Sequence, residues 1–125
     1  MQLHHIGYIV KNAEDSSSVQ DELHVVATAN DPMQVAKICL YKNRKNQLIE
    51  LVEPLNETSP VWNFLQKNGN GLHHECYEAN LEEIEKYASE NKLFKVMGPV
   101  PAVIFNNRMV LFYMSSEKKM IEFII

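Results

Sequence analysis

The sequence predicts an α+β domain built from two similar halves, and three observations support this prediction. First, LHHIGYIV at residues 3–10 is nearly repeated by GLHHECYEA at residues 71–79. Second, QLIELVE at residues 47–53 matches KMIEFII at residues 119–125, each with a glutamate between apolar residues. Third, each half has the pattern of a strand, a helix and further strands in that order. The recurrence of one order along the chain indicates an internal duplication.

Composition limits the class of protein. The chain has 125 residues, of which 46% are apolar and 22% charged, and this is enough for one domain with a hydrophobic core. A net charge of −4 without a basic run argues against nucleic-acid binding. No apolar run approaches about 18 residues and no signal-peptide pattern is visible, so we expect a cytoplasmic protein without a membrane span. Cys39 and Cys76 lie in apolar runs and are expected to be buried, reduced thiols.

The first half is expected to contain three strands and one helix. Residues 3–10, 34–41 and 47–53 have the composition of strands, and the polar KNRKN at 42–46 forms a turn between the last two. A short helix is expected at 13–23, where three consecutive serines weaken the helical pattern.

A connector helix is expected next, over about residues 58–69. Ser59 is placed to cap its N-terminus, Pro60 suits the first helical position and Gly69 suits the end. The expected organisation is one domain, residues 1–125, with a first module at about 1–55, this connector, and a second module at about 70–125.

The second half is expected to begin with a strand at 72–79 and a helix starting at Asn80. Asn80 and Glu83 have the spacing of a capping box, and Asn91 is placed to end the helix. The PVP at 99–101 keeps the chain extended and indicates a sheet edge. Further strands are expected at 93–98, 102–105, 108–114 and 119–125.

Each half supplies one histidine from its first strand and one glutamate from its last strand. Aligning HIGYIV with HECYEA matches His5 with His74, and aligning LIELV with MIEFI matches Glu50 with Glu122. A carboxylate between apolar residues of a strand is costly to bury without a partner. Because this occurs at matching places in both halves, we expect a divalent metal ion as the shared partner.

The charge and the ligand atoms of the four side chains indicate which ions the site would hold. Two neutral imidazoles and two carboxylates carry a charge of −2, which a divalent cation neutralises. This ligand set suits Zn, Ni, Co, Mn or Fe better than Ca or Mg. Since neighbouring residues of a strand point to opposite faces, His4 and His73 are expected to be structural residues on the other face.

The chain resembles the vicinal oxygen chelate superfamily, which includes glyoxalase I and methylmalonyl-CoA epimerase, and is most similar to the epimerase branch. The resemblance is carried by HHIGYIVKN at 4–12, by IELVEPLNETSPVWNFLQKNGNGLHHECYE at 49–78, and by IEF at 121–123. It implies a glyoxalase-like fold, in which two βαβββ modules form a cupped mixed sheet around one metal ion. It also places the metal ligands of the family at His5, Glu50, His74 and Glu122.

The resemblance further implies a reaction. Members of the superfamily chelate two substrate oxygens, and the metal stabilises the enolate formed when a neighbouring carbon loses its proton. Glu122 or Glu50 would transfer the proton, because Lys37 occupies the position where the epimerase branch sometimes has a glutamate base. Arg108 and Lys37 are candidates for binding an anionic part of the substrate.

Three functions remain as alternatives at this point. The first is a metal-dependent isomerase or epimerase like methylmalonyl-CoA epimerase, and the second is a lyase like lactoylglutathione lyase. The third is a non-catalytic binding protein of the bleomycin-resistance type. The expected partner is a small molecule, an acyl-CoA or a thiol adduct, and a homodimer is expected because small members of the superfamily usually pair.

Overall fold

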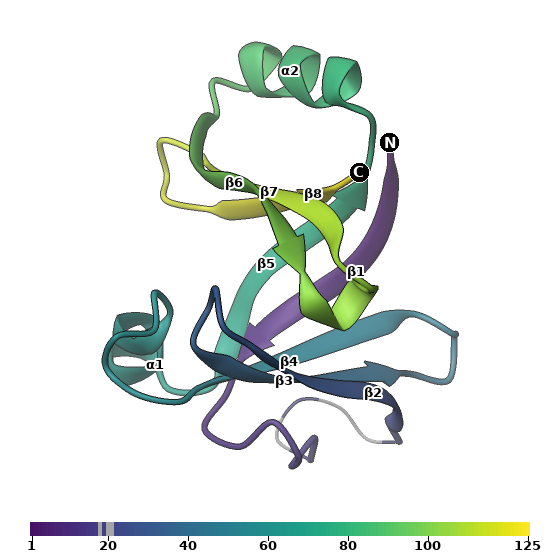
Figure 1. Ribbon diagram of the computed structural model, residues 1–125, viewed down its shortest axis with the longest axis vertical. Helices are drawn as coiled ribbons and strands as arrows, with labels where there is room; N and C mark the ends of the chain where they lie inside the picture. Colours follow the sequence, from purple (N-terminus) through teal and green to yellow (C-terminus); the bar gives the residue numbers. More distant parts are fainter. Residues whose placement is uncertain (18, 20–21) are drawn as a thin grey trace.

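A single curled, mixed sheet forms the framework of the protein (Figure 1). The computed structural model describes residues 1–17, 19 and 22–125. The eight strands of the sheet lie in the order β2-β3-β4-β1-β5-β8-β7-β6. The elements are β1 (Gln2–Ile9), β2 (His24–Asp31), β3 (Ala36–Lys42), β4 (Leu48–Pro54), α1 (Trp62–Asn68), β5 (Gly71–Glu78), α2 (Leu81–Glu90), β6 (Phe94–Ala102), η1 (Val103–Phe105), β7 (Arg108–Met114) and β8 (Met120–Ile124).

The two halves of the sheet have the same topology. In the first half β1 pairs in parallel with β4, and β4, β3 and β2 follow as antiparallel neighbours. In the second half β5 pairs in parallel with β8, and β8, β7 and β6 follow in the same way. Antiparallel pairing of β1 with β5 joins the halves at the centre. The predicted duplication is therefore confirmed.

The segment after β1 differs from the expectation. A helix was predicted at 13–23, but the described residues of this segment form turns and bends, and residues 18, 20 and 21 lie outside the described part of the chain. The side chains of Asn12 and Asp15 accept hydrogen bonds from the backbone N–H groups of Glu14 and Ser17, respectively. Such local bonds compete with helix formation. The strand β2, which the sequence analysis did not predict, follows directly.

The connector helix α1 begins later than predicted and without the expected cap. Its N-cap residue is Val61, which makes no side-chain capping bond. Ser59 instead donates its hydroxyl hydrogen to the backbone carbonyl of Gln34 at 2.6 Å, and this bond attaches the connector to the β2–β3 turn. Gly69 ends the helix as predicted, with φ of 66°.

The second half follows its predicted order more closely. Asn80 and Glu83 form the capping box at the start of α2, with both reciprocal hydrogen bonds present. Strand β6 continues through the PVP segment and lies at the sheet edge. The strand predicted at 102–105 is instead a turn of 3₁₀-helix over Val103–Phe105. Asn106 and Asn107 both have positive φ there, which ends the extended path and turns the chain into β7.

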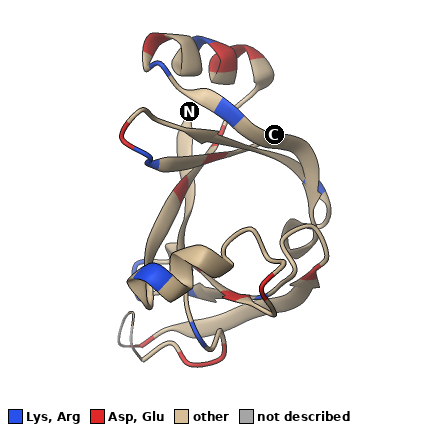
Figure 2. Ribbon diagram, turned by 90° about the vertical axis from the view of Figure 1, so that its left-hand side faces the viewer, with Lys and Arg blue, Asp and Glu red and all other residues tan. Residues whose placement is uncertain are grey.

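Each half of the sheet is covered on its outer face. In the second half, α2 packs Ile84 and Ala88 against buried side chains of β7 and β8, and its acidic residues are spread along the exposed turns (Figure 2). In the first half, the irregular segment after β1 takes the place of a helix. Tyr41 donates its hydroxyl hydrogen to the carbonyl of Ala13 at 2.6 Å and holds that segment against the sheet.

The inner face of the curled sheet holds the other part of the core. Leu40, Cys76 and Phe112 pack there with the η1 residue Phe105, while α1 contributes Leu65 at one end. Cys39 and Cys76 are both buried, free thiols, as predicted. No helix among the described residues is long and apolar enough to cross a membrane.

Candidate metal centre

Four buried polar side chains converge on the inner face at the junction of the two halves. His5 comes from β1, Glu50 from β4, His74 from β5 and Glu122 from β8, so that each half contributes one histidine and one glutamate. All four are buried, with exposed fractions of 1% to 3%. One ligand atom from each lies within 4.8 Å of the others. The structure thus brings together all four residues that the sequence analysis selected.

The distances between these atoms fit ligands that share one ion, and they are also those of histidine–carboxylate ion pairs. The Oε1 atom of Glu122 lies 3.1 Å from Nε2 of His5 and 3.1 Å from Nε2 of His74. The Oε1 atom of Glu50 lies 3.7 Å and 3.4 Å from the same two nitrogens. Two ligands at about 2.1 Å from a cation are separated by about 3.0 Å at a right angle and about 3.4 Å at the tetrahedral angle.

A buried atom without a well-formed hydrogen bond supports the same interpretation. Within the described part of the chain, Oε1 of Glu122 is buried and makes no hydrogen bond of good geometry, although Nε2 of His5 and Nε2 of His74 each lie 3.1 Å away. A buried carboxylate oxygen without a well-formed hydrogen bond is rare in folded proteins, because its desolvation is then compensated only in part. A bound cation would compensate it, so the residues present fit a divalent ion.

The strands place the two glutamates in matching apolar surroundings. Glu50 is paired with Leu40 on β3 and with Gly7 on β1. Glu122 is paired with Phe112 on β7 and with Cys76 on β5. Each carboxylate therefore lies between apolar or small side chains, which exclude water and strengthen its electrostatic interactions.

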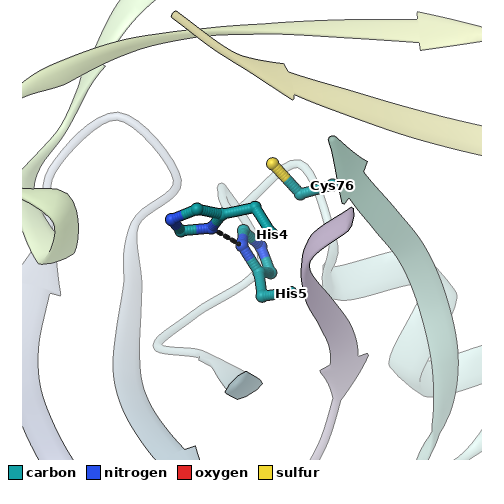
Figure 3. A group of neighbouring side chains, drawn as sticks. All are labelled: His4, His5 and Cys76. Atoms are coloured by element: carbon teal, nitrogen blue, oxygen red, sulfur yellow. Dashed lines mark hydrogen bonds between the residues drawn. The ribbon is translucent and has the colours of Figure 1, made fainter. Parts of the chain in front are cut away.

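The residue opposite His74 makes room for its ring. Gly7 pairs with His74 across the β1–β5 junction. A Cβ atom at Gly7 would lie 2.1 Å from Cε1 and 2.3 Å from Nε2 of His74, far inside van der Waals contact. At the matching position in the other half, Cys76 pairs with His5 and carries a small side chain instead. Figure 3 shows Cys76 next to His5 and His4.

The adjacent histidines do not lie on opposite faces, contrary to the expectation. The β1–β5 pairing shifts register twice. The shift between Leu3 and His5 makes His4 an extra residue of β1, and the shift between Gly7 and Tyr8 makes His73 an extra residue of β5. A β-bulge of this kind redirects the side chain of the extra residue. Nδ1 of His4 lies 2.8 Å from Nδ1 of His5 (Figure 3). Nδ1 of His73 lies 2.9 Å from Nδ1 of His74.

The electrostatics of the cluster favour an ion pair. Burial alone would lower the pKa of His74, but its contacts with Glu122 and Glu50 raise this pKa to about 10. Burial alone would raise the pKa of Glu122, but contacts with His5 and His74 hold it well below its usual range. Burial, followed by the neighbouring His74, lowers the pKa of His73 to about 3, so that His73 is a neutral imidazole.

The two predicted substrate-binding cations are not part of the cluster. Lys37 pairs in register with Glu53 and lies on the opposite face of β3 from Leu40, where its ammonium group forms an ion pair with Glu14. Its removal from the inner face follows from strand alternation. Arg108 begins β7, is exposed, and forms an ion pair with Glu78 at 2.8 Å.

Two clefts lead toward the cluster. One, of about 490 Å³, is lined by His4 and His5 together with Lys42 and Gln47. The other, of about 430 Å³, is mainly apolar and reaches His73. Its apolar lining includes Val61, Val96, Met97, Phe112, Met114 and Met120. From the sequence, Lys42 is one of several cations that could meet an anionic substrate, but a solvated turn position was the preferred interpretation. The methionine-rich lining was not predicted, because it follows no spacing pattern.

A curled mixed sheet with this buried cluster defines a candidate metalloprotein of the glyoxalase-like fold. A sequence profile of the Glyoxalase/Bleomycin resistance protein/Dioxygenase superfamily matches residues 4–112. The chain therefore belongs to this superfamily, as its resemblance implied.

Individual relatives and solved structures agree with that membership. The mitochondrial methylmalonyl-CoA epimerase of Dictyostelium discoideum is 25% identical over 116 residues, which are 89% of this chain and 69% of that protein. The crystal structure of hypothetical protein BH1468 from Bacillus halodurans C-125 has a TM-score of 0.80 at 30% identity, covering 98% of this chain and 92% of that one. The Streptomyces coelicolor methylmalonyl-CoA epimerase in complex with 2-nitronate-propionyl-CoA has the same fold, with a TM-score of 0.76 at 18% identity, covering 99% and 96%.

Proposed function

We propose that this protein is a metal-dependent epimerase that moves a proton at the carbon next to the carbonyl of an acyl-CoA, as a methylmalonyl-CoA epimerase does. The superfamily membership and the similarity to epimerases support the reaction class. The single observation that carries the proposal is the convergence of His5, Glu50, His74 and Glu122 at ligand-to-ligand distances inside a buried cluster.

These four residues would hold one divalent ion of the group Zn, Ni, Co, Mn or Fe. When bound, the ion would polarise a substrate carbonyl and make the neighbouring C–H more acidic. The cluster offers four protein ligand atoms, so a six-coordinate ion held there would leave two positions for substrate oxygens.

Glu122 and Glu50 are the proposed proton-transfer residues. Epimerisation removes a proton from one face of a carbon and returns it to the other face. The two carboxylates come from opposite halves of the sheet, on β8 and β4, and so approach the centre from two directions. On β3, the residue that faces this region is Leu40, so that strand contributes no acidic side chain next to Glu50.

The clefts suit the two ends of an acyl-CoA. The mainly apolar cleft beside His73 can receive the acyl group and keep water away from the reacting carbon. The cleft beside His4 is lined in part by Lys42, and Arg108 lies at the exposed start of β7. We propose that Lys42 and Arg108, in place of Lys37, bind the anionic parts of the substrate.

The decisive experiment measures proton exchange at carbon 2 of methylmalonyl-CoA in D₂O by NMR, with metal-loaded protein. We expect exchange in the wild-type protein and a loss of at least about 100-fold in Glu122→Gln, typical of removing an acid–base group. Glu57→Gln, which changes an exposed carboxylate in the loop before α1, is the matched control and should keep full activity. Absence of exchange in the metal-loaded wild-type protein would refute the epimerase proposal.

The same preparation distinguishes the two alternatives. Turnover of the glutathione hemithioacetal of methylglyoxal, without exchange on methylmalonyl-CoA, would indicate a lactoylglutathione lyase. Tight binding of a small molecule with turnover of neither substrate would indicate a sequestering protein. Sedimentation at the assay concentration tests the expected homodimer.

A further inference from the structure

Two histidines beside the cluster have no role in the reaction proposed above. His4 and His73 are the extra residues of two β-bulges at equivalent places in the two halves. Each lies with its Nδ1 at hydrogen-bonding distance, 2.8 Å and 2.9 Å, from the Nδ1 of the next residue, His5 or His74. The same arrangement thus occurs twice, on two strands that fold from separate parts of the sequence.

Aromatic rings fix both outer imidazoles in place. His4 packs edge-to-face on Phe105, with ring centroids 4.9 Å apart and an interplanar angle of 88°. His73 packs in the same manner on Phe64, at 5.1 Å and 81°. Phe105 belongs to η1 and Phe64 to α1, so that different elements support the two rings. A ring held between a bulge and an aromatic side chain has little freedom to turn away from its partner.

The position of one proton decides whether the inner histidines can bind a cation. A neutral imidazole has one N–H and one lone pair. Nε2 of His5 and Nε2 of His74 face the carboxylates of the cluster, each 3.1 Å from Oε1 of Glu122. To present a lone pair there, each ring must carry its hydrogen on Nδ1. That hydrogen then requires an acceptor, and the atom at hand is Nδ1 of the preceding histidine.

We propose that His4 and His73 are positioning residues that accept the Nδ1–H of His5 and His74 and so hold both rings with the Nε2 lone pair toward the cluster. This inference rests on the metal-binding part of the proposed function. Histidine also suits the charge of the site. A carboxylate is the usual acceptor at such a place, but two more carboxylates would raise the charge of the cluster from −2 to −4, whereas a neutral imidazole adds none.

Paired substitutions separate the hydrogen bond from the packing of the ring. His4→Phe and His73→Phe keep an aromatic ring but remove the acceptor, whereas His4→Asn and His73→Asn keep an acceptor near the position of Nδ1. His24→Phe and His24→Asn, at the exposed start of β2, are the controls. The probe is Co²⁺, titrated against a competing chelator and followed by its visible absorption spectrum.

We expect the Phe variants at the two positions to bind Co²⁺ roughly 10- to 100-fold more weakly than the wild-type protein, with the Asn variants recovering most of the loss. The controls should bind like the wild-type protein. Equal affinity of the Phe variants and the wild-type protein overturns the inference, and so does an Asn variant as weak as the Phe variant. Wild-type protein that binds no Co²⁺ refutes the metal-dependent function itself.

A second measurement needs no variant. In Zn²⁺-loaded protein with ¹⁵N-labelled histidine, an N–H···N hydrogen bond gives a scalar coupling between its two nitrogens. We expect one such coupling between Nδ1 of His4 and His5, and one between Nδ1 of His73 and His74. Their absence in folded, zinc-loaded protein would contradict the proposal even if epimerase activity is present.

Discussion

The ring of His74 lies over Gly7, in the space that a side chain at position 7 would need. Gly7 and His74 belong to different halves and face each other across the β1–β5 junction. The junction that joins the halves is therefore also the place where the cluster is assembled. A substitution at Gly7 in one half would therefore act directly on His74, a proposed metal ligand from the other half.

Adding one methyl group at this junction should disturb the site. In Gly7→Ala, the new Cβ would lie 2.1 Å from the His74 ring, so the ring must move or the strands must separate. We expect destabilisation of about 1–3 kcal/mol, typical of overpacking, together with metal binding at least about 10-fold weaker. Urea denaturation and Co²⁺ titration measure the two effects.

Gly71→Ala, on β5, provides the matched control for that substitution. A Cβ there would meet its nearest atom, on Phe64, at an ordinary 3.8 Å. We expect Co²⁺ affinity within about twofold of the wild-type value, because a contact at this distance requires no movement. Equal effects of the two alanines would show that the His74 ring does not depend on the space above Gly7.

Metal binding should stabilise the folded protein. The four proposed ligands come from strands β1, β4, β5 and β8, which are brought together only by folding. A free metal concentration about 100 times the Kd should therefore raise the free energy of unfolding by about 2.7 kcal/mol. His5→Ala and His74→Ala should remove this increment and reduce bound metal from about one ion per chain, as measured by elemental analysis.

A substitution in α2 tests whether that increment is specific to the ligands. Asn80→Ala removes the capping box of α2 and should lower stability by about 1 kcal/mol. The metal-dependent increment should persist in full in this variant, because Asn80 is not part of the cluster. If Asn80→Ala also lost the metal-dependent increment, the loss expected in the histidine variants would reflect general destabilisation and not the removal of a ligand.

Metal affinity should rise with pH well above neutrality. In the protein without bound metal, the contacts with Glu122 and Glu50 raise the pKa of His74 to about 10, so His74 carries a proton below that pH. Metal binding must displace this proton. The free protein thus binds one more proton than the metal complex below about pH 10, and the apparent affinity should increase about tenfold per pH unit between pH 6 and 8.

The slope of this pH dependence is the test. A histidine with its ordinary pKa of 6.5 would give an affinity that is level above about pH 7. Ni²⁺ titrations at pH 6, 7 and 8 distinguish the two cases. Glu50→Gln should reduce the slope above pH 7, because it removes one of the two carboxylates that stabilise the protonated ring.

The sequence by itself determined the duplicated order of elements and the identity of the four clustered residues. The repeated histidine and glutamate can be recognised in the sequence because successive residues of a strand point to alternate faces. A buried carboxylate also needs a partner in any fold, so its position between apolar residues predicts one. The capping box at Asn80 and Glu83 was also predictable, because its hydrogen bonds are local.

Only the tertiary structure decided the roles of residues whose partners are distant in sequence. Strand β2 alternates only from Ala27 onward, with small and polar residues in place of large apolar ones, and pairs along the edge of β3. Ser59 bonds to Gln34 instead of capping α1, and Lys37 lies on the outer face. The bulges that turn His4 toward His5 and His73 toward His74 depend on the register between β1 and β5. That register is set by packing between the halves, and no single stretch of sequence contains it.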